Sequence, residues 1–294
     1  IYFADAKGSN ANAVVDYCFA ALAFAALHKG FELSGSTVGI VGAGAVGGLF
    51  ASKLERLGVQ VRCCDPFLEQ ASGEHRQFFS LEEVLECEAV SLHVPLSDGG
   101  LFPTRHLLAA QELAKLRNNV VLINACRGNV VDERALEEVL AHRSDIVTVF
   151  DVWADEPNIN SRLAASVDIA TPHIAGYSQE AKSRATNMLV AAFERYSKFD
   201  AGMDAEDKLA ASVTVDIEPV SESMPLWETL LAVFPLIEIS EEFLQAQLAG
   251  EGARSFDSIR QKLLSRHEFE SCLLHSSNYS AEQLERLAVL GFQF

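Results

Sequence analysis

The chain has 294 residues, of which 49% are hydrophobic, and a formal net charge of −18 at pH 7. This length allows two or three domains with at least one sizeable core, and the composition excludes an intrinsically disordered protein. The negative charge argues against nucleic acid and anionic membranes as partners, so an anionic substrate must be bound by a few local cations.

The first predicted element is an apolar helix over residues 13–27, which His28-Lys29-Gly30 ends. Either Asn10 or Asn12 stands near its N-cap. The run is too short for a membrane span and contains Asp16, so we expect a buried helix and no membrane partner. No basic segment of the kind found in a signal peptide precedes it.

The six cysteines form no Cys-x-x-Cys pair and no spacing typical of a zinc site. We therefore expect reduced thiols, no metal and a cytoplasmic protein.

We predict a strand over residues 37–41 and a Gly-x-Gly-x-x-Gly turn over residues 42–47. A helix over residues 45–57 and a second strand over residues 59–64 follow. Gly42 permits the tight turn, Gly44 lets the backbone approach a pyrophosphate, and Gly47 lets the helix pack close to the strand. The amino end of the helix then faces the phosphates. Asp65, after the second strand, accepts hydrogen bonds from ribose hydroxyls and repels a 2′-phosphate, so NAD is predicted rather than NADP. The simpler alternative is a structural turn.

Short apolar strands alternate with helices from residue 34 to residue 171, which is typical of an α/β fold with a doubly wound parallel (Rossmann-type) sheet. Ser80-Leu81-Glu82-Glu83 is a capping box that starts a short helix. Another helix, over 132–142, has acidic residues in its first turns and basic residues at its end. The remaining strands are predicted at residues 89–94, 120–124, 146–152 and 168–171.

A long helix over residues 178–199 closes this region, and a polar linker is predicted at 200–208. Beyond it we expect a small α+β domain without an obvious catalytic motif. Its predicted elements are strands at 213–217 and 269–274, helices at 240–248 and 256–264, and a last helix capped by Ser280-Ala-Glu-Gln. We expect Arg266, His267 and His275 at a surface or an interface.

Three charged side chains follow strands in the second half of the predicted sheet, where open α/β folds bind their ligands. They are Arg127, Glu156 and His173. An arginine can grip a carboxylate, a histidine can accept the proton of a secondary alcohol, and a nearby glutamate raises the histidine pKa and fixes its tautomer. Each residue alone has a structural explanation, as an anchor, a surface acid or a core histidine. Together they favour catalysis.

Four segments carry a resemblance to a known family: Gly42-x-Gly44-x-x-Gly47, Asn124-Ala-Cys-Arg127-Gly128, Asp151-Val-Trp-x-x-Glu156-Pro157 and Pro172-His173-Ile-Ala-Gly176. They are similar to the motifs of the D-isomer-specific 2-hydroxyacid dehydrogenases. Within that family, Gly8-Ser-Asn10, His173-Ile-Ala-Gly-Tyr177 and Phe256-Asp-x-Ile-Arg260 resemble the members that oxidise a phosphorylated sugar acid in pyridoxal 5′-phosphate biosynthesis.

The resemblance implies a role for each matched residue. Arg127 binds the substrate, Glu156 activates His173, and His173 is the acid–base catalyst. Tyr177 approaches the substrate. The residues implied in NAD binding are Gly42, Gly44, Ala45, Val46, Gly47, Asp65, Pro95, Ala125, Cys126 and Asp151.

The resemblance also implies a division of the chain into four parts. Residues 1–30 would be a remnant of the substrate domain with an interdomain helix, 31–176 the NAD-binding domain, 177–200 a helix returning to the substrate domain, and 201–294 a dimerisation domain. A homodimer is therefore expected. Family members begin with a flavodoxin-like half-domain that the sequence from Ile1 does not show, so we expect either that the sequence is a fragment or that something else covers the apolar face of the helix over residues 178–199.

Two alternatives remain at this point. The chain is another D-2-hydroxyacid dehydrogenase, of the phosphoglycerate or glyoxylate type, or it is a non-catalytic NAD-binding protein or an inactive fragment. An intact set of Arg127, Glu156 and His173 argues against the second alternative, because a pure sensor needs no proton acceptor.

Overall fold

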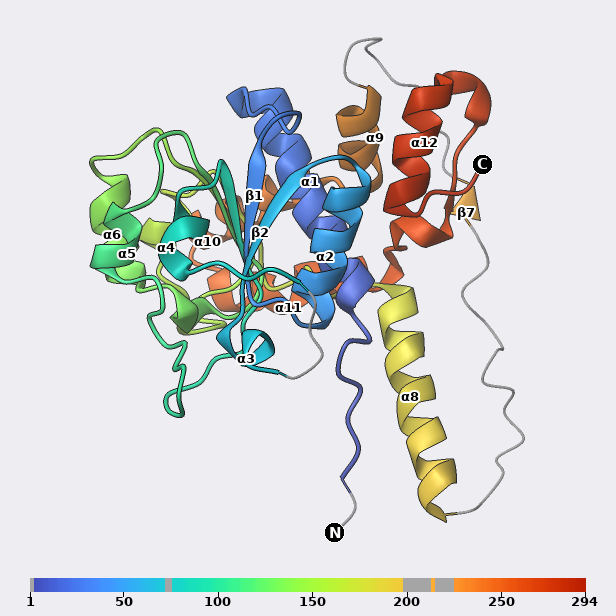
Figure 1. Ribbon diagram of the computed structural model, residues 1–294, viewed down its shortest axis with the longest axis horizontal. Helices are drawn as coiled ribbons and strands as arrows, with labels where there is room; N and C mark the ends of the chain where they lie inside the picture. The colour runs from blue at the N-terminus through green and yellow to red at the C-terminus, as the bar shows by residue number, and fades with distance from the viewer. Residues whose placement is uncertain (1–2, 72–75, 198–212, 215–224) are drawn as a thin grey trace.

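A computed structural model describes residues 3–71, 76–197, 213–214 and 225–294 of the chain. Its centre is a six-stranded sheet in the order β2-β1-β3-β4-β5-β6, and every neighbouring pair is parallel (Figure 1). The strands are β1 (Thr37–Val41), β2 (Gln60–Cys64), β3 (Ala89–Leu92), β4 (Val121–Asn124), β5 (Val147–Phe150) and β6 (Ile169–Ala170). The predicted doubly wound α/β fold is confirmed.

The chain leaves β1 in one direction to form β2 and returns on the other side of β1 to form β3. A reversal of strand order of this kind opens a crevice at the carboxyl ends of the strands, where such sheets bind ligands. The fold therefore places the predicted glycine-rich loop, which follows β1, at this crevice.

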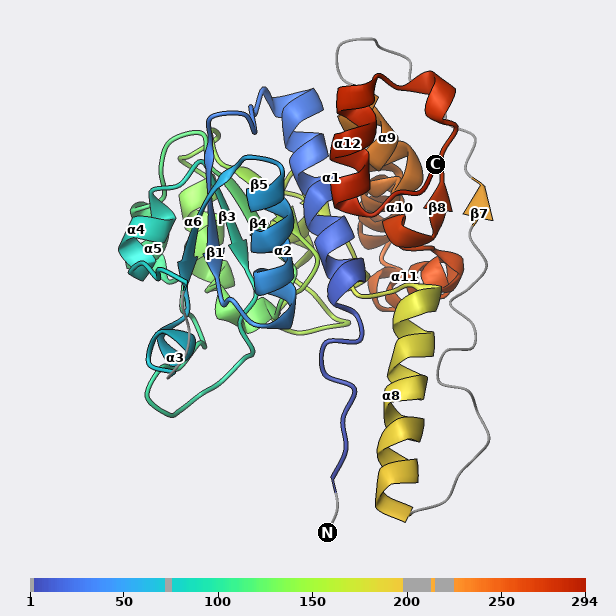
Figure 2. The same ribbon diagram turned by 45° about the vertical axis from the view of Figure 1, so that its right-hand side comes forward.

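Helices cover both faces of the sheet (Figures 1 and 2). One face carries α1 (Ala11–Lys29), α2 (Ala45–Arg56) and α10 (Leu236–Leu248), and the other carries α4 (Leu81–Leu85), α5 (Ala110–Ala114) and α6 (Glu133–Leu140). The short helices α3 (Pro66–Glu69) and α7 (Ser161–Ala164) complete this part. The predicted capping box of α4 is present, because Ser80 Oγ accepts from the Glu83 amide and the Glu83 carboxylate accepts from the Ser80 amide.

Helix α1 lies between the sheet and α9 (Pro225–Val233), and 15 of its 19 residues are buried. Its length and composition match those of a membrane span, but 83% of the matching window is buried inside the protein. The prediction of a buried helix is confirmed. Asn10 occupies the N-cap without a side-chain capping bond, and Gly30, at φ +71°, ends the helix as predicted.

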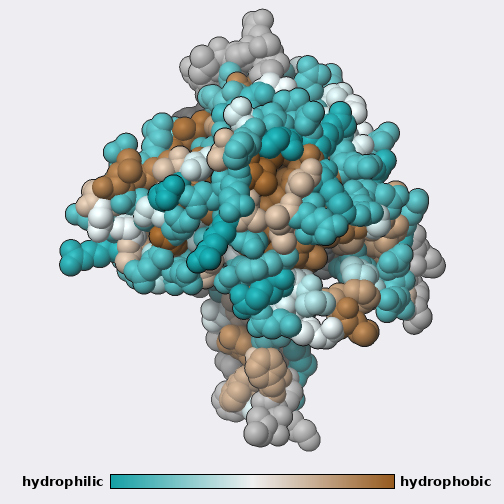
Figure 3. Space-filling model, turned by 90° about the vertical axis from the view of Figure 1, so that its left-hand side faces the viewer, coloured by the Kyte–Doolittle hydropathy of each residue, from teal (hydrophilic) through white to brown (hydrophobic). Residues whose placement is uncertain are grey.

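Helix α8 (Gln179–Ser197) projects from the body beside the first residues of the chain (Figures 1 and 2). Large apolar or aromatic side chains on it are exposed, namely Met188, Leu189, Phe193 and Tyr196. By contrast, hydrophilic side chains cover most of the opposite flank of the molecule, over α4, α5 and α6, with hydrophobic patches between them (Figure 3).

The C-terminal part contains α9, α10, α11 (Gly252–Lys262), α12 (Ala281–Leu290) and a parallel pair of short strands, β7 (Val213–Thr214) and β8 (Cys272–Leu273). Helix α9 was not predicted from the sequence. The predicted strand at 269–274 is shorter and follows a 3₁₀ turn, Phe269–Ser271. The predicted linker at 200–208 and residues 215–217 lie outside the described residues. Helix α9 packs on α1 and α10 packs on β6, so this part adjoins the Rossmann core.

Candidate functional site

The carboxyl ends of the six strands lie at one edge of the sheet, and the predicted site residues follow them directly. The first residues after the strands are Gly42, Asp65, His93, Ala125, Asp151 and Thr171. The edge therefore brings together segments that lie up to about 130 residues apart in the chain.

The glycine-rich loop has the backbone that a dinucleotide site needs. Gly42 has a φ of +91°, and a Cβ there would lie 2.8 Å from the His93 carbonyl oxygen. A Cβ on Gly47 would lie 1.9 Å from the Gly42 carbonyl oxygen, so only glycine lets α2 start this close to β1. Gly44 precedes the helix and has no atom within 4 Å of its Cβ position, which leaves room for a ligand.

Ala45 and Val46 form the first turn of α2, so their backbone N–H groups point out of the amino end of that helix. Asp65 follows β2 and accepts from the Ala43 amide at 2.9 Å with one oxygen and from the Leu68 amide at 3.1 Å with the other. A carboxylate offers about four acceptor positions, so capacity remains for ribose hydroxyls.

Pro95, Ala125 and Cys126 lie on the other side of the crevice, beyond β3 and β4. The Pro95 carbonyl accepts from Thr104 Oγ1 at 2.5 Å, which shapes the loop after β3. Cys126 is buried, and its thiol lies 3.2 Å from Asn124 Oδ1. Burial raises the pKa of this thiol to about 11, so it is protonated at neutral pH and is not a nucleophile.

His173 and Glu156 form a hydrogen-bonded pair. His173 Nδ1 lies 2.7 Å from Glu156 Oε2, while the other oxygen of Glu156 accepts from the Trp153 amide at 2.9 Å. The side chains are 34% and 24% exposed, so the pair is partly shielded but reachable. His173 has a φ of +55°, a left-handed conformation that is unfavourable for most residues with a Cβ and is typical of functional positions.

The surroundings of His173 shift its pKa in opposite directions. Burial lowers it, but the hydrogen bond to Glu156 and the negative charges of Asp151 and Glu156 together outweigh burial, so the pKa lies above its ordinary value of 6.5. The predicted effect of Glu156 on the histidine pKa thus has a geometric basis.

Asp151 is fully buried beneath this turn. Its Oδ1 accepts from Thr171 Oγ1 at 2.7 Å and from the Ile174 amide at 2.8 Å, and its Oδ2 accepts from the Ala175 amide at 2.8 Å. In the structure the Asp151 carboxylate therefore holds the Thr171 side chain before His173 and the backbone after it. Its predicted contact with the nicotinamide carboxamide stays a prediction.

Arg127 follows β4 and lines a cleft of about 790 Å³ together with Tyr177. The turn that carries it is pressed against the Trp153 loop, because a Cβ on Gly128 would lie 1.9 Å from the Trp153 carbonyl carbon. Arg127 therefore lies on the segment next to the one that carries Glu156. Its own side chain is exposed, and its Nη1 donates to the Cys126 carbonyl at 2.5 Å.

Sequence reasoning missed Arg260 of α11, which lines the same cleft as Arg127. The motif that contains Arg260 was noted only as part of the family resemblance, because nothing local shows that α11 reaches the sheet edge. Arg266, expected at a surface or an interface, is buried where the C-terminal part meets α1 and the Tyr177 turn. Its side chain is 5% exposed, and it donates to the carbonyls of Tyr177, Ala175 and Ala13.

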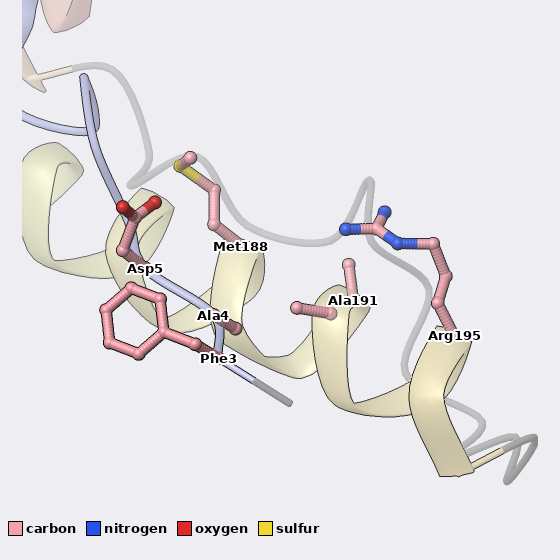
Figure 4. Close-up of a pocket in the computed structure, with 7 residues that line it drawn as sticks. Phe3, Ala4, Asp5, Met188, Ala191 and Arg195 are labelled. Atoms are coloured by element: carbon pink, nitrogen blue, oxygen red, sulfur yellow. The ribbon is translucent and has the colours of Figure 1, made fainter. Parts of the chain in front are cut away.

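A second cavity, of about 500 Å³, lies between the first residues of the chain and α8 (Figure 4). Phe3 and Asp5 border it on one side, and Met188, Ala191 and Arg195 project from α8 on the other. None of the predicted site residues lines it. Among the described residues, no group of three or more His, Cys, Asp or Glu side chains is arranged to hold a metal ion.

Comparisons with known proteins show what the whole chain is similar to. Residues 21–175 match the family described as D-isomer specific 2-hydroxyacid dehydrogenase, NAD binding domain. An erythronate-4-phosphate dehydrogenase of Shewanella loihica is 40% identical over 303 residues, and one of Pseudoalteromonas atlantica is 36% identical over 291 residues. The alignments cover 99% and 98% of this chain and 77% and 76% of those proteins.

Solved structures share the fold. The NAD⁺-bound 3-phosphoglycerate dehydrogenase of Entamoeba histolytica aligns with a TM-score of 0.54 at 26% identity, over 69% of this chain and 66% of that one.

Proposed function

Because the chain belongs to the D-isomer-specific 2-hydroxyacid dehydrogenase family, we propose that it oxidises the 2-hydroxyl of 4-phospho-D-erythronate, giving 3-hydroxy-2-oxo-4-phosphobutanoate. It is an NAD-dependent oxidoreductase of this family. The choice of substrate is supported by the relatives that align over nearly the whole chain, which carry the name erythronate-4-phosphate dehydrogenase.

The observation that carries the proposal is the pair of His173 and Glu156 at the carboxyl edge of the sheet. With Nδ1 held by the carboxylate, Nε2 is the ring nitrogen that accepts the hydroxyl proton. Glu156 then stabilises the imidazolium that forms. Asp151 contributes by fixing the turn of His173 from below.

Arg127 binds the substrate carboxylate in this proposal. Its guanidinium has five N–H donors, of which the structure shows one engaged, with the neighbouring Cys126 carbonyl. A planar guanidinium matches a carboxylate in two parallel hydrogen bonds, which orients the adjacent C2 atom. Tyr177, in the same cleft, is proposed to contact the substrate beyond C2.

The cofactor site fits NAD. The open space at Gly44, the amino end of α2 and the carboxylate of Asp65 suit a pyrophosphate followed by a ribose with two free hydroxyls. Pro95, Ala125 and Cys126 are proposed to line the nicotinamide half. When bound, NAD supplies the hydride acceptor, while the protein positions the substrate and removes its proton.

We further propose that the reaction serves pyridoxal 5′-phosphate biosynthesis, as the resemblance carried by the Gly8, His173 and Phe256 motifs implies. The protein is cytoplasmic, which the free state of all six cysteines supports. It is a homodimer through its C-terminal part, where Leu248 and Phe294 are exposed. Light scattering on the purified protein tests this last statement, since a monomeric mass contradicts it.

The full-length protein should form NADH from NAD and 4-phospho-D-erythronate, followed by absorbance at the NADH band. A panel with 3-phospho-D-glycerate, D-glycerate and glycolate tests the phosphoglycerate and glyoxylate alternatives. A higher kcat/KM for any of these three acids contradicts the proposed substrate. Binding of NAD without turnover of any acid contradicts the proposed activity.

A further inference from the structure

The charged side chains that line the cleft of Arg127 are mainly positive, although the protein as a whole is negatively charged. Four basic side chains and one acidic side chain line it, namely Lys7, Arg127, Lys182, Arg260 and Asp257. The chain as a whole has a formal charge of −18. A local excess of positive charge in a cleft attracts an anion that the rest of the surface repels.

Arg260 is held in place within this cleft. Its guanidinium carbon lies 4.8 Å from the centre of the Tyr177 ring, and its Nη2 donates to the Tyr177 hydroxyl. The Arg260 side chain is only 28% exposed. A planar guanidinium stacked on an aromatic ring keeps its orientation, so its remaining N–H groups point in fixed directions.

The donors of Arg260 are poorly satisfied in the described part of the chain. Its Nε is buried and has no hydrogen-bond partner. Its contact with Asp257, at 4.0 Å, is long, and the Asp257 side chain is 81% exposed, so solvent screens the attraction. A buried donor without an acceptor is costly, and one explanation for such a donor is a water molecule or an ion that completes the site.

Two lysines add charge to the same cleft. Lys7 precedes α1 and Lys182 lies in the first turn of α8, and both side chains are exposed. Within the described residues, neither ammonium group has an ion pair. The first turn of α8 lies close to the end of α11, because Gln179 bonds to the backbone at residues 265 and 266 (Figure 2).

We infer that Arg260, with Lys7 and Lys182, binds the phosphate group of the substrate in the cleft where Arg127 binds its carboxylate. This inference rests on the proposed function. A phosphate monoester carries nearly two negative charges at neutral pH and three acceptor oxygens, which suit one guanidinium and two ammonium groups. The C-terminal part thus supplies a substrate-specificity residue.

Arg260 also lies near the reacting centre. Its positive charge is one of the influences that oppose protonation of His173 and lower its pKa. Because Arg260 packs on the ring of Tyr177, which follows His173 by four residues, the phosphate-binding group lies on the same side of the fold as the proton acceptor.

The test compares Arg260→Gln with Arg254→Gln, since Arg254 is exposed on the same helix and does not line the cleft. We expect Arg260→Gln to lower kcat/KM for 4-phospho-D-erythronate by about 100-fold and that for D-erythronate by less than about threefold. Lys182→Gln should lower kcat/KM for 4-phospho-D-erythronate alone, by about tenfold. Arg254→Gln should change neither value.

If Arg260→Gln lowers kcat/KM equally for the two acids, the inference is overturned and the proposed function stands. The same holds if the variant shifts the pH profile equally for both acids without a selective loss on the phosphorylated one. If wild-type protein oxidises neither acid, the proposed function fails, and binding of inorganic phosphate decides the inference separately. Titration calorimetry should then show phosphate affinity about tenfold weaker in Arg260→Gln than in Arg254→Gln. Equal affinity of the two variants overturns the phosphate site.

Discussion

The imidazole Nδ1 of His173 lies 2.7 Å from Glu156 Oε2, although 16 residues separate the two in the chain. The carboxylate therefore both fixes the tautomer and, against the lowering effect of burial, raises the histidine pKa. In the oxidation the neutral imidazole accepts a proton, and in the reverse reduction the imidazolium donates one. The pair thus sets the pH at which each direction runs.

We predict that Glu156→Gln moves the acid limb of the kcat/KM profile for oxidation to lower pH, because the histidine loses the charge that favours its protonated form. Reduction of the oxo acid at neutral pH should fall by about 10- to 100-fold, as expected for the loss of a hydrogen bond between charged groups of about 1.5–3 kcal/mol. Asp155→Asn, at an exposed neighbouring carboxylate, is the matched control. An unchanged pH profile in Glu156→Gln contradicts the role of the pair.

We predict that His173→Asn lowers kcat by about 10²- to 10⁴-fold, the usual contribution of a general acid–base group. Asparagine is chosen because it tolerates a positive φ better than most residues, and His173 has a φ of +55°. The dissociation constant for NAD, measured by titration calorimetry, should stay within about twofold of wild type, since no cofactor contact is removed. His142→Asn on the exposed end of α6 is the control, and turnover of His173→Asn near the wild-type rate rules out the mechanism.

We predict that Arg127→Lys lowers kcat/KM by about 10- to 100-fold for 4-phospho-D-erythronate and D-erythronate alike, because a lysine cannot form two parallel bonds to a carboxylate. This equal loss is the opposite of the selective loss expected for Arg260→Gln. Arg134→Gln, at an exposed arginine of α6, serves as the control. A loss confined to the phosphorylated acid would assign Arg127 to the phosphate instead.

The sequence was most informative where a pattern is local. The Gly42-x-Gly44-x-x-Gly47 turn lies between β1 and α2 as predicted, because the strand, turn and helix depend on neighbouring residues. The carboxyl-edge positions of Arg127, Glu156 and His173 follow from the parallel order of the sheet, so they were predictable without distances. The sequence predicted that Glu156 lies near His173, but the distance of 2.7 Å between them comes from the structure alone.

Sequence reasoning was least informative where packing between distant segments determines the position of a side chain or a helix. Arg266 was expected at a surface or an interface, and the sequence does not choose between them; in the structure three backbone carbonyls and Asp16 surround it. The role proposed for Arg260 depends on α11 ending beside α8, about 80 residues earlier in the chain. Helix α9 was missed because its mostly apolar sequence shows no clear amphipathic period.

We predict that Asp65→Ser lowers kcat/KM for NAD by about tenfold and reduces the preference for NAD over NADP, since the variant no longer repels a 2′-phosphate. Serine is chosen because it still caps a helix, and Asp65 caps α3 through the Leu68 amide. Serine loses the bond from the Ala43 amide, so the free energy of unfolding should fall by about 1–3 kcal/mol. Glu69→Gln is the control, and an unchanged cofactor preference contradicts the ribose contact.

Asp16 joins α1 to the C-terminal part of the protein. It is 1% exposed, its Oδ2 accepts from the Phe269 amide at 2.9 Å, and it lies 3.8 Å from Arg266 Nη1. Asp16→Ala leaves the buried Phe269 amide without its acceptor and the buried Arg266 guanidinium without this nearby carboxyl group. We predict a loss of about 1–3 kcal/mol in the free energy of unfolding at about pH 5, measured in urea, which is the usual cost of leaving a buried hydrogen-bond donor unpaired. A loss below about 1 kcal/mol contradicts a structural role for this contact.

Asp16→Asn separates the charge of this residue from its hydrogen bond. Burial raises the Asp16 pKa to about 7, although Arg266 opposes this, so the folded protein holds the proton more tightly than the unfolded chain. The contribution of this carboxyl to stability is therefore fully present below about pH 4 and is lost as the pH rises through about 7. The amide keeps an acceptor for Phe269 but does not titrate. From pH 4.5 to pH 7.5 the wild-type protein should therefore lose unfolding free energy that Asp16→Asn does not lose. An equal change with pH in the two proteins contradicts the raised pKa.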